Sequence, residues 1–503
     1  MTDKSLPSCS QPLYAVIDLG SNSFHMLIAR LVADSVQIVD KVKRKVRLAS
    51  GLDSEYNLDA KAMARGWECL SFFAERLQDI PPQNIRVVGT ATLRLAQNRQ
   101  QFLDRAERIL GHPIEVISGQ QEAQNIYLGV AHTTCSANKR LVIDIGGAST
   151  ELVVGEGFDC ALACSVNIGC VTFNKTFFKG DQYTHSSFEQ AVTAARTALA
   201  PHKQAYQQQG WDIALGVSGT LQAVAEILTE QGKVQQITRD NLQQISELAI
   251  HCGHLAALEI EGLTAERKPV FVAGLAILIA IVDEFELTRV ILAQGAIREG
   301  ILYELLPNMR NVNIRQRTIS GLIQRFSIDE RHAYRVANIA DSAFTQLAKA
   351  WSLTLPMSSI LQSACALHEI GLLLEYKNNK QHGQYILANA DLAGFSQAER
   401  LLLIALVGNY KGDFDHRAID QQNFIDSQST LYLIVILRLA VILAKRRKDD
   451  VMPSFRINGK PQAAQLVLDR SFLHSHPLIS AELKQEVTDL AAQGFNLTIS
   501  AKE

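Results

Sequence analysis

Hydrophobic residues before about position 312 follow two alternating periods, one typical of strands and one of helices. Apolar runs bounded by turn residues predict strands at 14–19, 27–33, 36–48 and 114–119, one within 85–94 that ends at Gly89, and two within 140–155. Helical spacing predicts helices at 58–78 and 99–110, and strand–glycine junctions recur at 211–220 and 289–300. This alternation predicts an α/β fold that binds ligands at the ends of its strands.

Beyond about position 312 the strand signals fade and helical spacing dominates. The predicted helices are 329–350, 358–373, 383–390, 397–408 and 428–447, and a mixed tail includes a strand at 464–470. We therefore predict four domains: 1–135, 136–312, 313–450 and 451–503. The most apolar stretch, 271–282, is too short to span a bilayer, so we expect a buried helix there and no membrane association.

One pattern occurs twice: YAVIDLGSNS at 14–23 and RLVIDIGGAST at 140–150. Each is an apolar run followed by Asp, an apolar residue, Gly and a cluster of small polar residues. Glycine lets the backbone approach an anion, and an Asp at the end of a strand can hold the Mg²⁺ that phosphates share. The pattern therefore predicts two halves of a phosphate cleft, with Asp18 and Asp144 as metal ligands. The alternative is two structural turns, since D-x-G also serves turn geometry alone.

Two carboxylates add to this prediction. Glu151 follows Asp144 closely enough to reach the same ion. Glu122 lies at the start of a predicted helix, where it could orient and deprotonate a water aimed at a terminal phosphate. A carboxylate at a helix start also serves simply to match the helix dipole, so the spacing alone leaves both interpretations of Glu122 open.

Positive charge is concentrated in KVKRKVR at 41–47. On a strand, Lys41, Lys43, Lys45 and Arg47 share one face and Arg44 lies on the other. Such a strand is either a solvated edge that discourages aggregation or a wall for a highly charged phosphate substrate. Further arginines are candidates for holding phosphate; they are Arg94, Arg267 and Arg298.

The overall composition limits which binding partners and which cellular compartment we expect. The 503 residues carry a net charge of −2, with 47% hydrophobic and 20% charged residues, which indicates a soluble globular protein without a general affinity for nucleic acid. Eight cysteines without a C-x-x-C pair favour a reducing cytoplasm and make a zinc site unexpected. The N-terminal segment lacks the apolar core of a signal peptide.

The motifs together resemble the exopolyphosphatase / guanosine pentaphosphate phosphatase family. They occur in the family's order and are DLGSNSFHM at 18–26, GTATLR at 89–94, SGQQEA at 118–123, DIGGASTEL at 144–152, NIGCVTF at 167–173, GVSGT at 216–220 and GAIREG at 295–300. The resemblance implies an actin-like, ribonuclease-H-like two-domain core, a helical domain and a small C-terminal domain. It also implies Mg²⁺-dependent hydrolysis of terminal phosphoanhydrides, in a homodimer.

The resemblance also assigns roles to residues. The family's catalytic glutamate falls on Glu122, and the acid that precedes it is Gln121 here, which would remove one charge near the metal. Metal-binding carboxylates fall on Asp144 and Glu151, with Asp18 in support. Phosphate contacts fall on Gly20, Ser21, Asn22, Ser23, Arg94, Gly146, Gly147, Ala148, Ser149 and Thr150. To these we add Ser218, Gly219 and Thr220 as predicted phosphate contacts and, from the basic residues themselves, a predicted polyanion wall at Lys43, Arg44, Lys45, Arg47 and Arg267.

The helical region resembles the HD phosphohydrolase fold, whose metal ligands are His, His-Asp and a late Asp. His332 and His368 match, but Glu369 replaces the Asp and the late Asp falls near Val441, which cannot ligate. We therefore predict a binding or dimerisation module without catalytic metal. The cluster Lys445, Arg446 and Arg447 is a candidate contact for a nucleotide, or a solvated helix end.

Several stretches, among them KRKVRLASGL, are closer to the family's guanosine pentaphosphate phosphatases than to its dedicated exopolyphosphatases. The resemblance thus implies conversion of pppGpp to ppGpp, with polyphosphate as a second substrate. Three alternatives remain: a dedicated exopolyphosphatase, a kinase on the same core, and a non-enzymatic alarmone or polyphosphate sensor. The chain shows no evident acceptor site for a kinase, and intact Glu122, Asp144 and Glu151 argue against a sensor.

Overall fold

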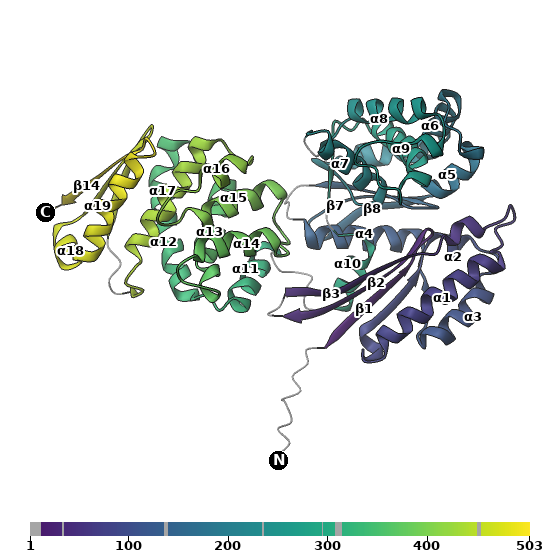
Figure 1. Ribbon diagram of the computed structural model, residues 1–503, viewed down its shortest axis with the longest axis horizontal. Helices are drawn as coiled ribbons and strands as arrows, with labels where there is room; N and C mark the ends of the chain where they lie inside the picture. The colour runs from purple at the N-terminus through teal and green to yellow at the C-terminus, as the bar shows by residue number, and fades with distance from the viewer. Residues whose placement is uncertain are drawn as a thin grey trace, which may run out of the picture. The chain divides into compact units, whose positions relative to one another are not determined.

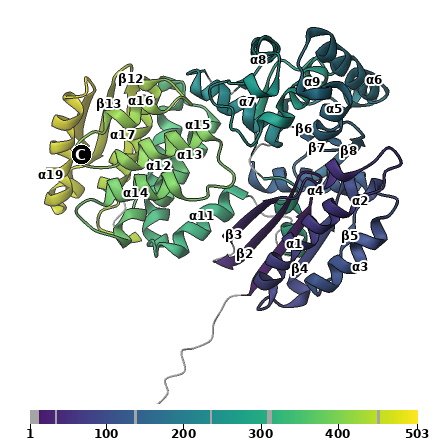
Figure 2. The same cartoon turned by 45° about the vertical axis from the view of Figure 1, so that its right-hand side comes forward.

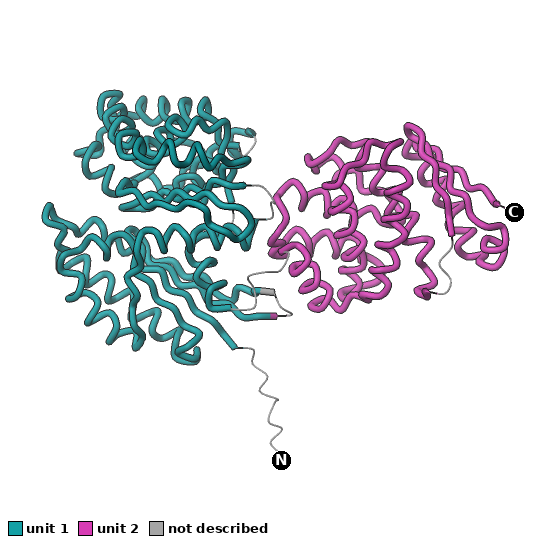
Figure 3. The backbone as a smooth tube through the Cα atoms, turned by 180° about the vertical axis from the view of Figure 1, so that it is seen from behind, with its two compact units in different colours: residues 1–31, 36–312 teal, residues 32–35, 313–503 magenta. Residues whose placement is uncertain are grey.

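The computed structural model describes residues 12–32, 35–134, 139–233, 236–293, 295–306, 314–449 and 454–502. The chain forms two compact units, residues 1–31 with 36–312 and residues 32–35 with 313–503 (Figure 3). The boundaries expected near 135, 312 and 450 all lie outside the described residues. The division into four domains therefore stays a prediction.

The first unit begins with a mixed sheet in the order β3-β2-β1-β4-β5. Its strands are β1 (Leu13–Leu19), β2 (Ser23–Val32), β3 (Ser35–Lys45), β4 (Ile85–Gly89) and β5 (Glu115–Val116). β1 pairs antiparallel with β2 and parallel with β4, so the Asp18 end of β1 and the end of β4 lie at the same edge. We call this sheet and its covering helices the first lobe.

A second sheet repeats this plan, in the order β10-β11-β9-β6-β7-β8. Its strands are β6 (Arg140–Ile145), β7 (Thr150–Glu156), β8 (Asp159–Val166), β9 (Ile213–Gly216), β10 (Gln236–Ile237) and β11 (Val290–Leu292). β6 again pairs antiparallel with the next strand, β7, and parallel with a later one, β9. This duplication confirms the predicted actin-like fold class. The second sheet and its helices are the second lobe.

Two helices lie between the sheets: α4 (Gly119–Thr133) and α10 (Ile297–Leu305). Their apolar side chains share one core with both sheets, for example Ile126 and Ile301 with Val16 and Val142. The two helices cross so closely that a Cβ on Gly300 would lie 1.8 Å from the carbonyl oxygen of Asn125. The resulting layers, sheet, helix pair, sheet, are visible in Figures 1 and 2.

The remaining helices of the first unit cover the outer faces of the sheets. On the first lobe they are α1 (Ala60–Leu77), α2 (Ala91–Leu95) and α3 (Arg99–Leu110). On the second lobe they are α5 (Cys170–Phe177), α6 (His185–Gln209), α7 (Gly219–Glu230), α8 (Arg239–Cys252) and α9 (Lys268–Glu284). The apolar run at 271–282 is buried within α9, as predicted. No described helix combines the length and apolar composition that crossing a bilayer would need.

The second unit is a helical bundle with a small sheet. Its helices are α11 (Ile314–Arg325), α12 (Glu330–Trp351), α13 (Leu355–Leu367), α14 (Asn379–Asn389), α15 (Gln397–Gly408), α16 (His416–Gln421), α17 (Ser427–Leu443), α18 (Arg470–Ser475) and α19 (Pro477–Ala491). β12 (Phe455–Lys460), β13 (Ala463–Asp469) and β14 (Asn496–Lys502) form the sheet. The strand predicted at 464–470 corresponds to β13. No bounds were predicted for β12 and β14 within the mixed tail.

Candidate functional site

A cleft of about 440 Å³ opens in the first unit, between the strand ends of the two lobes. Both repeated loops line it, and so do the start of α4 and the loop before α10. The predicted residues on its wall are Asp18, Gly20, Ser21, Asn22, Ser23, Lys41, Lys43, Glu122, Asp144, Gly146, Gly147, Ser149, Glu151, Ser218, Gly219, Thr220, Arg267 and Arg298. Residues distant in the sequence thus meet in one place, where parallel strands of both sheets end.

The two repeated loops touch one another across the cleft. A Cβ built on Gly147 would lie 2.8 Å from Ser21 Cβ and 3.6 Å from the backbone nitrogen of Asn22. Only glycine fits at this distance, so Gly147 allows the loops to meet without displacing either backbone. Their amides and hydroxyls therefore face one shared space.

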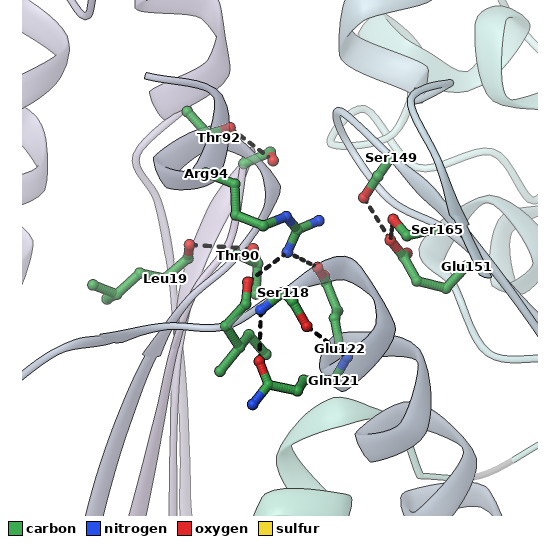
Figure 4. A network of polar contacts seen from close by, with 12 residues as sticks. Leu19, Thr90, Thr92, Arg94, Ser118, Gln121, Glu122, Ser149, Glu151 and Ser165 are labelled. Atoms are coloured by element: carbon green, nitrogen blue, oxygen red, sulfur yellow. Dashed lines mark hydrogen bonds and ion pairs between the residues drawn. The ribbon is translucent and has the colours of Figure 1, made fainter. Parts of the chain in front are cut away.

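The loops differ in what lies opposite each aspartate. Asp144 pairs with Glu151 across the β6–β7 hairpin, whereas Asp18 pairs with His25 across the β1–β2 hairpin. Glu151 is buried and its Oε1 accepts hydrogen bonds from Ser149 Oγ at 2.6 Å and Ser165 Oγ at 2.7 Å (Figure 4). The second hairpin therefore presents two carboxylates, and the first presents one carboxylate and an imidazole.

His25 has a cationic neighbour. It lies 3.0 Å from an Arg298 guanidinium nitrogen through its Nδ1, which must accept because guanidinium only donates. Burial first, and then Arg298, lowers the pKa of His25 to about 3, so the ring is neutral at physiological pH. The neutral His25 of the first hairpin thus holds the guanidinium of Arg298, which comes from α10, at the cleft.

Glu122 is buried in the first turn of α4, whose N-cap is Ser118. Its Oε2 accepts a 2.5 Å hydrogen bond from Arg94 Nη1, and Figure 4 shows the two side chains pointing toward one another. Arg94 also donates to the carbonyl oxygen of Ile117 at 3.2 Å. Arg94 is not part of the cleft wall, and its hydrogen bond holds the Glu122 carboxylate in place; its predicted contact with phosphate stays a prediction.

Gln121 does not lie near the proposed metal, where the sequence placed it. Its side-chain oxygen accepts from the Ser118 amide at 2.8 Å, while its own amide donates to Ser118 Oγ at 3.1 Å. This capping box leaves Gln121 exposed and outside the cleft wall. A neutral residue here therefore removes no charge from the cleft, contrary to the expectation from the sequence.

Four carboxylates share the cleft, and their pKa values are raised. Burial is the main cause for Asp18 and Asp144, whose pKa rises to about 7 in each case, and the neighbouring carboxylates add to it. Burial and then the charges of Glu122 and Asp144 raise the pKa of Glu151 well above its usual value. Burial also raises the pKa of Glu122, although Arg94 opposes the shift.

This donor set fits a hard divalent cation. Carboxylate oxygens are the ligands that Mg²⁺ and Ca²⁺ prefer, and Asp18 Oδ1 is buried without a hydrogen-bond partner. A cation among Asp18, Asp144 and Glu151 would offset both the burial and the mutual repulsion that raise their pKa values. The residues present therefore suit a metal shared with phosphate oxygens.

A third loop, on the second lobe, brings potential donors for an anion to the cleft. Ser218 precedes the first turn of α7, and its buried Oγ has no hydrogen-bond partner. The guanidinium of Arg267 lies directly over Gly219, so close that a Cβ there would be 2.0 Å from Arg267 Cζ. A helix start with a stacked guanidinium and a free hydroxyl forms a favourable environment for an anion.

The basic segment at 41–47 only partly faces the cleft. Lys41 and Lys43 line it, and Lys43 forms a 2.7 Å ion pair with Glu266 of the second lobe. Lys45 lies outside the wall, 3.8 Å from the same Glu266 oxygen. Arg44 lies on the opposite face, over the Phe72 ring, as the alternation predicts.

Arg47 corrects one prediction. β3 ends at Lys45, and Arg47 adopts a left-handed backbone with φ of 52°, so it does not share the face of Lys41 and Lys43. Its amide donates to the Asn22 carbonyl at 2.8 Å, which ties this turn to the first of the two repeated loops.

Two residues of the second repeated loop that were predicted to contact phosphate, Ala148 and Thr150, lie outside the cleft wall. The Thr150 hydroxyl donates to the Ile168 carbonyl at 2.6 Å.

Two residues of the site escaped the sequence argument: His25 and Ser165. When DLGSNSFH is aligned with DIGGASTE, His25 takes the position that Glu151 has in the second repeat. This alignment could have identified His25 as a candidate site residue. Ser165 reaches Glu151 from β8, in a segment that carries no motif, so only the pairing of β7 with β8 reveals it.

In the second unit, the structure brings together His332, His368 and Glu369. Potential ligand atoms of the three lie within 4.8 Å of one another. The guanidinium of Arg447 bonds both Glu369 and Asp329 and so compensates the carboxylate with a cation from the chain itself. That this module lacks catalytic metal stays a prediction.

The other basic residues considered for nucleotide binding are also engaged within the second unit. Lys445 pairs with Glu482, and Arg446 lies 3.0 Å from His476 Nε2. Their proposed role toward a nucleotide has no direct support from these contacts.

Two family profiles match the chain. The profile of the Ppx/GppA phosphatase family matches residues 27–309, and that of its domain III matches 314–487. Two relatives are named guanosine-5'-triphosphate,3'-diphosphate pyrophosphatase. The one from Pseudoalteromonas translucida is 46% identical over 489 residues, covering 97% of this chain and 98% of the relative. The one from Aeromonas hydrophila is 47% identical over 487 residues, with the same coverage.

Solved structures show the same fold. An exopolyphosphatase from Cytophaga hutchinsonii superposes with a TM-score of 0.54 at 23% identity, covering 59% of this chain and 98% of that one. The Aquifex aeolicus member of the Ppx/GppA family gives 0.50 at 23% identity, with 59% and 98% covered. The family profile spans more than half of the chain and two relatives match it almost from end to end, so the chain belongs to the Ppx/GppA phosphatase family.

Proposed function

We propose that this protein hydrolyses the terminal 5′-phosphate of pppGpp to give ppGpp and phosphate, with inorganic polyphosphate as a second substrate. The names of the two nearly full-length relatives support the nucleotide. The observation that carries the chemistry is the buried Glu122, held by Arg94 within the cleft that also contains Asp18, Asp144 and Glu151. A carboxylate fixed beside a metal and phosphate site is what water activation needs.

In the proposed reaction a water oxygen attacks the terminal phosphorus as the bond to the bridging oxygen breaks. Glu122 accepts the proton of that water, and the bridging oxygen leaves as part of ppGpp. Burial raises the pKa of Glu122, which strengthens it as a base, while Arg94 opposes that shift and orients the carboxylate. Arg94 therefore acts as a positioning residue.

Substrate phosphates are proposed to lie against the two repeated loops and the start of α7. The backbone at Gly20 and Gly146 allows close approach, and Arg267 and Arg298 supply positive charge. Lys43 extends this charge toward the mouth of the cleft. Mg²⁺, which Asp144, Glu151 and Asp18 would hold, would neutralise charge on the phosphate oxygens.

Replacing Glu122 tests the proposal. Glu122→Gln keeps the shape and removes the base, so we expect kcat for phosphate release from pppGpp to fall by roughly 10²–10⁴ with little change in pppGpp binding. Gln121→Glu is the matched control, because it changes the adjacent, exposed position and should leave kcat near the wild-type value. A Glu122→Gln enzyme that works at the wild-type rate would refute the mechanism.

A second comparison separates the substrates. We expect kcat/KM to be higher for pppGpp than for long-chain polyphosphate; the reverse would make the protein a dedicated exopolyphosphatase. Tight binding of either compound without phosphate release would make it a sensor. We further propose a cytoplasmic homodimer, consistent with the free state of the described cysteines, Cys69, Cys160, Cys164, Cys170, Cys252 and Cys365. Analytical ultracentrifugation of the full chain tests the oligomeric state.

A further inference from the structure

The second unit contains a cavity of its own, of about 620 Å³. It lies between the start of α14 and the loop that joins α15 to α16. It shares no residue with the cleft of the first unit. Neither the catalytic proposal nor the motifs in the sequence give it a role.

The wall of this cavity is rich in positive charge. Lys377, Lys380 and Lys411 line it, and none of them pairs with a carboxylate among the residues that the structure describes. Lys380 Nζ donates to the Asp413 carbonyl at 2.7 Å, and both Lys380 and Lys411 are partly buried. Burial is the main cause that lowers the pKa of each of these two lysines, a cost that an anionic ligand would offset.

The acidic residues on the wall only partly offset this charge. Asp413 and Asp415 both act to raise the pKa of Lys380, but the wall carries three lysines against these two aspartates. Asp415 Oδ1 accepts from the Ala418 amide at 3.2 Å and its Oδ2 accepts from Gln384 Nε2 at 2.8 Å. Asp413 is exposed at the rim. Arg438 lies beneath the loop and donates to the Gly412 carbonyl at 2.8 Å, but its charge is compensated by the buried Glu486, whose Oε1 it contacts at 2.6 Å.

The start of α14 adds amide donors. Its N-cap, Asn378, forms no side-chain cap, and the first helical residues, Asn379, Lys380 and Gln381, line the cavity. An uncapped helix start beside lysines favours an anion such as phosphate.

Other features of the wall suit a ligand that is more than an anion. Tyr376 is 79% exposed at the rim, and Lys411 Nζ lies 5.0 Å from the centre of its ring. A bare phosphate chain offers no ring to stack on Tyr376, whereas a nucleoside does.

We propose that this cavity is an accessory nucleotide site, with phosphates against Lys380, Lys411 and the start of α14, and the base stacked on Tyr376. The proposal goes beyond the catalytic function and does not depend on it, because the ligand class is inferred from this cavity alone. The site would let the helical unit bind a phosphorylated nucleoside separately from the cleft.

Hydrogen exchange read peptide by peptide tests this site separately from the cleft. The probe is ppGpp added to the full-length protein. We expect exchange to slow several-fold in peptides covering 376–384 and 408–415. Lys380→Ala combined with Lys411→Ala should abolish that protection, while the exposed pair Lys349→Ala and Lys460→Ala, with the same change in charge, should preserve it. Unchanged exchange in 376–384 with saturating ppGpp would overturn the proposal, whatever the cleft peptides show.

Two further arms separate a nucleotide from a polyanion. Tyr376→Ala, at an exposed position that should not disturb folding, is expected to raise the ppGpp concentration for half-maximal protection at least roughly fivefold. Tripolyphosphate at the same concentration should not protect 376–384. Equal protection by tripolyphosphate, together with no effect of Tyr376→Ala, would make this a polyphosphate site and would refute the nucleotide proposal.

Discussion

The β1–β2 and β6–β7 hairpins occupy equivalent positions in the two lobes but have opposite electrostatic character. Each places an aspartate one residue before the end of its first strand. Opposite that aspartate lies His25 in the first hairpin and Glu151 in the second. His25 is neutral and accepts from Arg298, so the first hairpin favours an anion, while the paired carboxylates of the second favour a cation. We therefore propose that the first hairpin, which we call the phosphate half, mainly serves phosphate, and that the second, the metal half, mainly serves the metal.

The largest test of this division concerns metal affinity. Asp144→Asn removes a ligand from the paired carboxylates, so we expect the Mg²⁺ concentration for half-maximal activity to rise roughly 100-fold or more. Asp18→Asn should raise it by about tenfold or less, since no second carboxylate lies opposite. Mn²⁺ binding followed by electron paramagnetic resonance gives the same comparison without turnover. Equal losses for the two variants would show that the hairpins share the metal evenly.

The metal half should also destabilise the metal-free protein. The pKa of Asp144 rises from 3.8 to about 7 on folding, so between these values the folded state holds more protons than the unfolded state. The free energy of unfolding without metal should therefore fall as pH rises from about 4 to about 7. Asp144→Asn removes this contribution and should stabilise the metal-free protein at pH 8, on the order of 2–4 kcal/mol. Urea denaturation with EDTA measures it; a variant less stable than wild type at pH 8 would contradict the assignment.

Converting the first hairpin to the pattern of the second tests the phosphate half. His25→Glu places a carboxylate opposite Asp18 and beside Arg298, so we expect KM for pppGpp to rise roughly tenfold through repulsion of phosphate. His25→Gln retains an acceptor for Arg298 and should stay within about threefold of wild type. Steady-state kinetics at saturating Mg²⁺ distinguishes them, and similar KM values for both variants would argue against an anionic ligand at this hairpin.

The smallest expected effect concerns the lysines of β3. Lys43 lines the cleft and Lys45 does not, so Lys43→Ala should raise KM for pppGpp about threefold, and Lys45→Ala should change it little. The effect of Lys43→Ala should shrink at high salt. If both variants leave KM unchanged at low salt, the strand serves only to protect the sheet edge.

The sequence could predict those parts of the site that depend on local order along the chain. The ends of β1 and β6, and hence Asp18 and Asp144, follow from apolar runs that stop at D-x-G, and Glu122 follows from the start of a helix. The helix predicted at 99–110 coincides with α3. These features depend on near neighbours, which strand and helix periodicity encodes.

Side-chain partners could not be predicted in the same way. The sequence did not indicate that Arg94 holds Glu122, 28 positions away, or that Arg298 meets His25 across 273 positions. Such contacts depend on how the lobes pack, which no periodicity encodes. The prediction that Arg47 lies on the strand was wrong for a different reason. The alternation continues in the sequence, but β3 ends at Lys45 and Arg47 itself has a left-handed backbone.

The attachment of Glu122 has one more consequence. Its helix, α4, packs against β7 and β8 of the second lobe, yet Arg94, which holds its carboxylate, comes from α2 of the first lobe. A small sliding of one sheet past the other would stretch that bond and turn the base away from its water. The rate of turnover would therefore depend on how the two lobes are aligned. Gly129 and Gly300 set the spacing of the intervening helices, so substitutions there would slow the reaction although neither residue contacts a reacting group.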